Sequence, residues 1–152
     1  MKIKIITVGK TKSTDPIMAM INEYLKQIRW KIEFIEIENS LIGSIDKIKE
    51  KEGELIISKI KPTSYVIALE PKGELFSSQD IASTFQNLAN NNLNEISFII
   101  GGSHGLCNTL LQKASLKLSF GKITLPHKLA RLVLTEQIYR SWCILNNKQY
   151  DK

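Results

Sequence analysis

Hydrophobic and polar positions alternate with two different periods along the chain, and these periods predict strands and helices in alternation. Residues 2–8 alternate basic and β-branched side chains, which is the period of a strand, and Gly9 ends the pattern. Residues 17–28 place apolar side chains at helical spacing directly after Asp15 and Pro16. Aspartate can cap free N–H groups and proline has no N–H to lose, so this pair predicts the start of a helix.

Segments with strand and helix patterns continue to alternate up to the C-terminus. Residues 96–100 are apolar at consecutive positions, as in a strand that is buried on both faces. Strands that alternate with helices need crossover connections, so the pattern predicts an α/β domain over residues 1–152, with a mostly parallel sheet of about five strands and helices on both faces. The remaining strands are expected at 31–38, 65–69 and 117–120, and the remaining helices at 44–60, 77–88, 106–116 and 128–145.

The net charge of +6 is unevenly placed. Residues 1–103 hold 13 basic and 13 acidic side chains and sum to zero, whereas residues 104–152 hold eight basic and two acidic ones and carry the whole excess. A polyanionic partner is therefore expected to contact the C-terminal third. The alternative is that these basic residues form only a solvated surface.

The composition also indicates where the protein is expected to act and whether it is expected to bind a metal. The apolar run at the N-terminus is too short for a secretory core or a membrane span, and two cysteines are too few for a disulfide framework. We therefore expect a cytoplasmic protein with reduced thiols and no membrane association. His104, Cys107, His127 and Cys143 lack paired metal-ligand spacing, so no metal site is expected.

Three candidate ligand-binding segments follow predicted strands: residues 69–73, 101–105 and 121–127. Ligands in open parallel sheets bind beyond the carboxyl ends of the strands, which is where these segments are expected. Glycines in the middle segment would let the backbone approach a ligand closely, although such a turn can also be purely structural. Its spacing matches neither the dinucleotide fingerprint nor the P-loop.

The last predicted helix carries a polar face. Glu136, Tyr139, Arg140 and Cys143 share that face, and the carboxylate and guanidinium are spaced to pair. The alternative is a surface ion pair that contributes less than about 1 kcal/mol.

The same helix is apolar on more than one side. Such a helix is either central to its own fold or paired with a second subunit, and we favour a dimer interface over burial within the monomer. The apolar stripe comprises Leu134, Ile138, Trp142 and Leu145, and a further patch comprises Leu129, Leu132 and Val133.

Several ordered segments closely resemble the RlmH family of ribosomal RNA methyltransferases. The similarity covers essentially the whole chain, because the N-terminal residues 1–10 and the KEGE motif at 51–54 match as well. The segments that carry it are FIIGGSHGL (98–106), LSF (118–120), TLPH (124–127) and RLVLTEQIYRSW (131–142).

This family belongs to the SPOUT class, so the resemblance implies an α/β domain with a C-terminal trefoil knot that works as a homodimer. It also implies that the knotted segment holds S-adenosylmethionine in a bent shape. The cofactor-binding residues that the resemblance implies lie in the three segments after strands that are identified above. They are Leu69, Gly102, Gly121, Lys122, Ile123, Thr124, Leu125 and Pro126.

The implied reaction is methylation of N3 of a pseudouridine in large-subunit (23S) ribosomal RNA on the assembled ribosome. The sulfonium of the donor is already activated, so the protein must orient the reactants, accommodate the imide proton and neutralise phosphates, without a metal. Glu136, Arg140, Tyr150 and Lys152 are the candidate catalytic residues.

The C-terminus departs from the family pattern, which usually ends in Tyr-His followed by Arg or Lys. This chain ends in Tyr150, Asp151 and Lys152. An aspartate can accept a proton, but it adds negative charge where RNA would approach. Two alternatives follow: an RNA-binding module of the same fold with impaired catalysis, and a SPOUT methyltransferase with another uridine or pseudouridine target.

Overall fold

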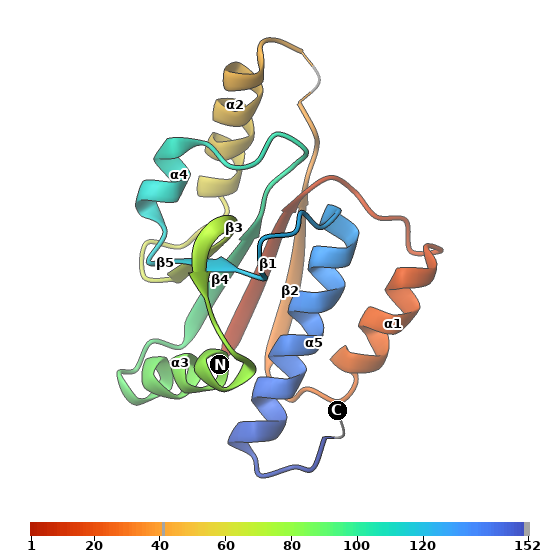
Figure 1. Ribbon diagram of the computed structural model, residues 1–152, viewed down its shortest axis with the longest axis vertical. Helices are drawn as coiled ribbons and strands as arrows, with labels where there is room; N and C mark the ends of the chain where they lie inside the picture. The colour runs from red at the N-terminus through yellow and green to blue at the C-terminus, as the bar shows by residue number, and fades with distance from the viewer. Residues whose placement is uncertain (41, 151–152) are drawn as a thin grey trace.

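The computed structural model describes residues 1–40 and 42–150, in which strands and helices alternate (Figure 1). The predicted elements are all present, and most bounds agree within three residues of the expected ones. The helix expected at 106–116 is shorter because the backbone at Cys107 is extended and the helix begins after it. The elements are β1 (Lys2–Val8), α1 (Pro16–Leu25), β2 (Lys31–Ile37), α2 (Ile45–Ile57), β3 (Tyr65–Leu75), α3 (Ser78–Asn90), β4 (Glu95–Ile100), α4 (Asn108–Lys113), β5 (Leu116–Ser119) and α5 (His127–Leu145).

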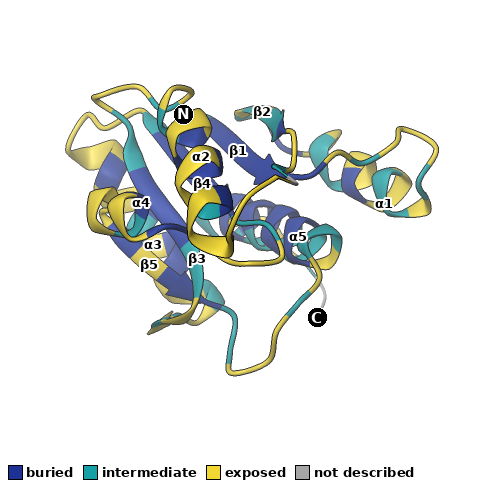
Figure 2. Cartoon of the chain, turned by 90° about the horizontal axis from the view of Figure 1, so that it is seen from above, coloured by how far each residue is buried: buried dark blue, intermediate teal, exposed yellow. Residues whose placement is uncertain are grey.

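The five strands form one parallel sheet in the order β2-β1-β4-β3-β5. Helices α1, α3 and α5 pack on one face and α2 and α4 on the other, as Figures 1 and 2 show. Alternate residues of β1 enter the two cores, Ile3 and Ile5 on the first face and Ile6 and Val8 on the second. This arrangement confirms the predicted α/β class with helices on both faces. The trefoil knot and the single-domain assignment stay predictions.

Strand β3 leaves the ladder where it passes β5. Its first part pairs in register up to Leu69 opposite Leu118, and pairing resumes with Glu74 opposite the same residue, so residues 70–73 bulge outward. A Cβ atom at Gly73 would lie 2.5 Å from the carbonyl oxygen of Lys117, so only glycine fits there. The sequence predicted a short apolar strand at 65–69, whereas the structure continues β3 to Leu75 because pairing with β5 resumes beyond the bulge.

Helix α5 is buried within the monomer, and this corrects the favoured interpretation of its apolar stripe. Leu134, Ile138 and Trp142 are at most 3% exposed and pack in the core shared with α1 and α3. The second patch is different, because Leu129 is 45% exposed. The stripe is therefore core, and only the patch around Leu129 remains for a partner. No helix in the described part of the chain is long and apolar enough to cross a membrane.

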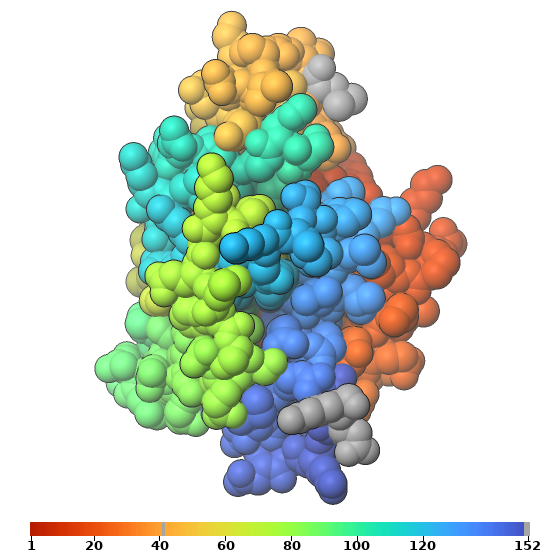
Figure 3. Space-filling view, in the orientation of Figure 1, coloured from red at the N-terminus to blue at the C-terminus, as the bar shows by residue number. Residues whose placement is uncertain are grey.

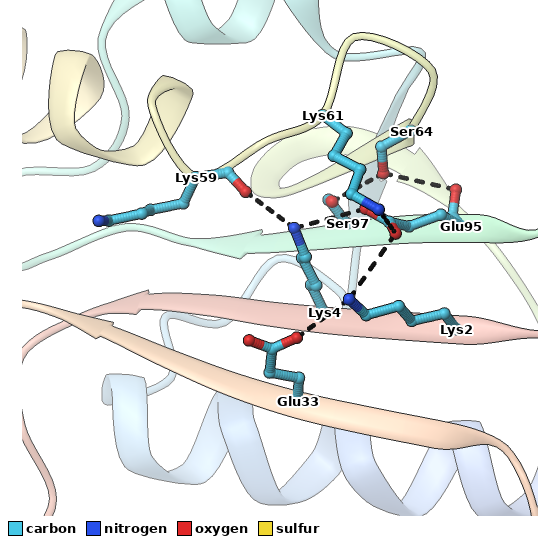
Figure 4. Close-up of polar contacts among 8 residues, drawn as sticks. All are labelled: Lys2, Lys4, Glu33, Lys59, Lys61, Ser64, Glu95 and Ser97. Atoms are coloured by element: carbon cyan, nitrogen blue, oxygen red, sulfur yellow. Dashed lines mark hydrogen bonds and ion pairs between the residues drawn. The ribbon is translucent and has the colours of Figure 1, made fainter.

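Charged groups are also packed at the amino end of the sheet (Figure 4). The carboxylate of Glu95 lies 3.4 Å from the Nζ atom of Lys4 and 3.1 Å from that of Lys61. Lys4 is only 8% exposed, and its ammonium also donates to the carbonyl oxygen of Lys59 at 3.1 Å. Burial alone raises the pKa of Glu95, but Lys61 and Lys4 together hold it below its ordinary value.

Because that pKa is lowered in the folded state, Glu95 stabilises the fold above its unfolded pKa, and the contribution is lost as pH falls through the folded value. Glu95→Gln is therefore expected to lower the free energy of unfolding at neutral pH by roughly 1–3 kcal/mol and to weaken its dependence on acid pH. Urea unfolding from pH 3 to 7 measures both quantities. Glu23→Gln, at an exposed ion pair with Lys26, is the control and should change little.

Candidate functional site

A cavity of about 970 Å³ lies beyond the carboxyl ends of β1, β3, β4 and β5. Its apolar wall includes Leu69, Ile100 and Leu118, and its rim is formed by residues 70–72, 101–105, 121 and 123–127. These are the strand ends where ligands bind in open parallel sheets. The volume is at the upper end of the range typical of small-molecule sites.

The turn after β4 presents backbone to this cavity. Gly105 N–H donates to the carbonyl oxygen of Gly102 at 3.0 Å, and Gly105 has φ +77°, which favours glycine. A Cβ at Gly102 would lie 3.1 Å from Cγ1 of Val8 and 3.3 Å from Oε2 of Glu52. The turn therefore packs against the end of β1. A side chain at position 102 would fit only if the turn or these neighbouring side chains moved.

One buried hydroxyl joins the β3 bulge to the loop after β5. The Ser119 side chain accepts from the N–H of Gly121 at 3.1 Å, and its own proton can go to the carbonyl of Pro71 at 3.0 Å or of Gly121 at 3.1 Å. Ser119 is 3% exposed, so these bonds are shielded from water. It lies in the quoted LSF motif, but nothing in the sequence indicated that it would link two walls of a cavity.

Ser119→Ala is expected to loosen both walls together. The fold should lose about 1 kcal/mol, because a buried hydrogen-bonded hydroxyl is removed. Affinity for a ligand in the cavity should fall several-fold, because the loop must then be ordered by the ligand. Urea unfolding and calorimetry with S-adenosylmethionine measure the two effects. Affinity equal to that of the native chain would show that the loop is held by other contacts.

The structure brings nearly all the predicted cofactor residues to this one cavity. Lys122 belongs to the same loop but does not line the cavity, and its side chain is exposed. That these residues hold a cofactor stays a prediction. The residues that line the cavity are Leu69, Gly102, Gly121, Ile123, Thr124, Leu125 and Pro126.

Behind the β1 side of the cavity lies a buried ion pair that sequence reasoning missed. Arg131 is 1% exposed, and its guanidinium donates to Oε1 of Glu36 at 2.8 Å and to the hydroxyl of Thr7 at 2.5 Å. The same Glu36 oxygen accepts the N–H of Thr11 at 3.0 Å. One carboxylate thus joins β2, the β1–α1 loop and α5. No local signal in the sequence indicates this pairing, because its partners are 95 residues apart.

His127 begins α5 and lines the cavity beside this ion pair. Its Nε2 atom is buried without a hydrogen-bond partner among the described residues, and it would lie 3.3 Å from a Cβ at Gly9. Burial first, and then the nearby Arg131 and Lys128, lower the pKa of His127. The imidazole is therefore neutral at pH 7 and can exchange hydrogen bonds with a ligand.

Three of the predicted catalytic residues, Glu136 and Arg140 of α5 and Tyr150 beyond it, form a second cluster. Both the Nε and one terminal nitrogen of Arg140 donate to Oε1 of Glu136, at 2.9 and 2.6 Å. The guanidinium carbon of Arg140 lies 4.5 Å from the centre of the Tyr150 ring, and Gln137 donates to the other Glu136 oxygen at 2.6 Å. The predicted pair at helical spacing is confirmed, and a tyrosine from the C-terminal segment covers it.

This cluster is separate from the cavity in a single chain. Glu136 lies nine residues beyond His127 on α5, roughly 13 Å along the helix axis, and none of Glu136, Arg140 or Tyr150 lines the cavity. Burial, with smaller effects of Tyr24 and Glu136, raises the pKa of Tyr150 well above its usual value, so the phenol stays protonated. Hydrogen bonding to Glu136 raises the pKa of Arg140. Asp151 and Lys152 lie outside the described residues.

Comparisons with known proteins agree with this geometry. A family model described as "Predicted SPOUT methyltransferase" matches residues 1–151. Proteins named ribosomal RNA large subunit methyltransferase H, from Acholeplasma laidlawii and Limosilactobacillus fermentum, are 46% and 44% identical to this chain, with both partners covered completely in each case. A solved structure of a probable methylase family protein from Haemophilus influenzae has a TM-score of 0.58 at 14% identity, covering 99% of this chain and 70% of that one, and so supports the fold. The chain therefore belongs to the SPOUT methyltransferase family.

Proposed function

We propose that this protein methylates large-subunit ribosomal RNA with S-adenosylmethionine as the methyl donor. The observation that carries the proposal is the cavity at the carboxyl ends of the strands, which gathers seven of the eight residues expected to contact the donor. The names of the full-length relatives at 40–46% identity support the RNA substrate. Action on ribosomal RNA supports a cytoplasmic location, which is part of the proposal.

The cavity suits such a donor in shape and chemistry. Its apolar walls can enclose an adenine ring, and the backbone groups of the turn 101–105 and the loop 121–126 can bond the polar edges. Gly105 and Gly121 have positive φ, and a Cβ at either would meet nothing within 4 Å, so both expose backbone rather than side chain. When bound, the donor supplies an activated methyl group on a sulfonium.

For the target we propose N3 of a pseudouridine on the assembled ribosome. Both oxygens of Glu136 already accept hydrogen bonds, and Tyr150 stays protonated, so the cluster is suited to hold the RNA base and backbone rather than to remove a proton. Arg140, paired with Glu136, then contacts the RNA as part of this cluster. We propose that Lys152 also acts on the RNA.

A homodimer is part of the proposal, because one chain keeps the Glu136 cluster apart from the cavity. The patch on α5 that remains exposed at Leu129, with half-buried Leu132 and Val133 beside it, is the proposed contact between copies. Leu129→Lys should then give monomers in sedimentation velocity. Trp142→Lys would not test the interface, because that side chain is core.

Incorporation of labelled methyl groups tests the function. Ribosomes from cells that lack the homologous enzyme should accept label in large-subunit RNA, and mass spectrometry should locate it at N3 of a single pseudouridine. Ribosomes from cells with that enzyme are the control and should accept none. A folded protein that adds no label to ribosomal RNA would contradict the proposal.

Asp151 motivates a second candidate, an RNA-binding module of the same fold with impaired catalysis. Calorimetry separates the two, because such a module need not retain affinity for S-adenosylmethionine. A third candidate, methylation of another uridine or pseudouridine, would appear in the mass-spectrometric map as label at a different nucleotide.

A further inference from the structure

Exposed and half-exposed lysines from separate segments surround the mouth of the cavity. Lys49 of α2 and Lys72 of the β3 bulge line it, and the exposed Lys122 lies between Gly121 and Ile123, which also line it. Figure 3 shows the bulge, the turn and the loop adjoining on one face of the molecule. The convergence is a product of the fold, since these residues are far apart in the sequence.

These lysines are free to contact an external anion. Within residues 1–40 and 42–150, no carboxylate forms an ion pair with Lys49, Lys72 or Lys122. Glu70 is the one acidic residue among the described residues that line the cavity, and its Oε1 accepts the backbone N–H of Lys72 at 3.4 Å. The mouth is therefore positively charged overall.

Several basic residues of the C-terminal third are less available to a partner than the lysines at the mouth. Three of them form ion pairs within the chain, so their charge is largely neutralised before any partner arrives. They are Lys128 with Asp15, Arg131 with Glu36, and Arg140 with Glu136. The count of charges along the sequence therefore does not show where free charge lies in the fold. Two of the three free lysines at the mouth, Lys49 and Lys72, come from residues 1–103, whose charges sum to zero.

We propose that Lys49, Lys72 and Lys122, the lysine rim, hold the phosphate backbone of the RNA across the mouth of the cavity. The inference rests on the proposed function, because it takes RNA as the substrate. A lysine is a compact charge on a flexible stem and contacts phosphates without sequence preference. Three lysines around the mouth fix where the RNA strand crosses it and leave the mouth itself free for a base.

Salt dependence of RNA binding tests the lysine rim directly. Each phosphate that a protein neutralises steepens the fall of the binding constant with salt, by about 0.7 in logarithmic slope for single strands. Lys49→Gln, Lys72→Gln and Lys122→Gln combined should therefore reduce the slope for poly(U) RNA by about 2. Fluorescence anisotropy across a salt series measures it. Absence of poly(U) binding by the native chain at low salt would overturn the proposal.

A matched triple variant supplies the control. Lys31, Lys113 and Lys117 are also exposed and without an ion pair among the described residues, but none lines the cavity. Their replacement by glutamine removes the same charge and should leave the slope nearly unchanged. Equal reductions in the two variants would overturn the rim and indicate binding by net charge alone.

Two further measurements separate this inference from the proposed function. The rim variant should unfold at the same urea concentration as the native chain, because surface lysines contribute little to stability. Binding of S-adenosylmethionine is measured on the native chain. If the native chain fails to bind the donor while poly(U) affinity still depends on the lysine rim, the methyltransferase proposal is contradicted and the lysine-rim proposal is supported. If the rim variant methylates ribosomes at the native rate over a salt series, only the lysine-rim proposal is contradicted.

Discussion

Glu36→Ala is expected to lower the free energy of unfolding by about 3–5 kcal/mol, because it leaves the buried charge of Arg131 without its counter-ion. Arg131 is 1% exposed, and its remaining polar contact outside its own helix is the hydroxyl of Thr7. Urea unfolding monitored by tryptophan fluorescence measures the change. Glu38→Ala is the control, since its ion pair with Lys10 is largely exposed and should contribute less than about 1 kcal/mol.

The double variant Glu36→Leu with Arg131→Met separates stability from positioning. Buried ion pairs are often replaced by apolar residues without loss of stability, so much of the lost stability should return. Affinity for S-adenosylmethionine should stay low, because Thr11 and the start of α5 have lost the carboxylate that ties them together beside the cavity. Full recovery of affinity would show that the ion pair only supports the fold.

Gly102→Val is expected to lower affinity for S-adenosylmethionine by about 100-fold or more, which corresponds to about 2.7 kcal/mol of binding free energy. The new side chain would press on Val8 and Glu52, and the turn would move into the cavity. Calorimetry measures the affinity, and circular dichroism should show an intact fold. Affinity within a few-fold of native would place the donor elsewhere.

A rescue experiment distinguishes displacement of the turn from direct blockage. Gly102→Ala should weaken donor binding, and adding Val8→Ala should restore much of it, because the nearest atom to the new Cβ is then removed. If the second change restores nothing, the methyl group at position 102 acts on the donor itself.

The sequence predicted the elements well because each carries local signals. Asp15 caps α1 through a bond to the N–H of Ile17, and Ser77 and Asp80 form a reciprocal cap on α3. A run of consecutive apolar residues also identified the buried central strand β4. The ends of these strands therefore could be predicted as a ligand site, since their positions follow from a parallel sheet alone.

What the sequence could not give depends on contacts between distant segments. Nothing local distinguishes Arg131, buried against Glu36, from Arg140, which pairs one turn away along its own helix. The stripe at Trp142 was assigned to an interface because periodicity shows that a helix is apolar but does not show what covers it. The continuation of β3 past Gly73 depends on a register shift against β5, which no pattern within β3 contains.

The contact between Thr7 and Arg131 also has a consequence for biosynthesis. It closes a separation of 124 residues, so the wall behind the cavity is complete only when nearly the whole chain has been translated. Closing such long loops costs entropy before any contact is gained, which slows folding. Newly made chains should therefore acquire a sheet early and the ability to take up a methyl donor late, as the final helix docks.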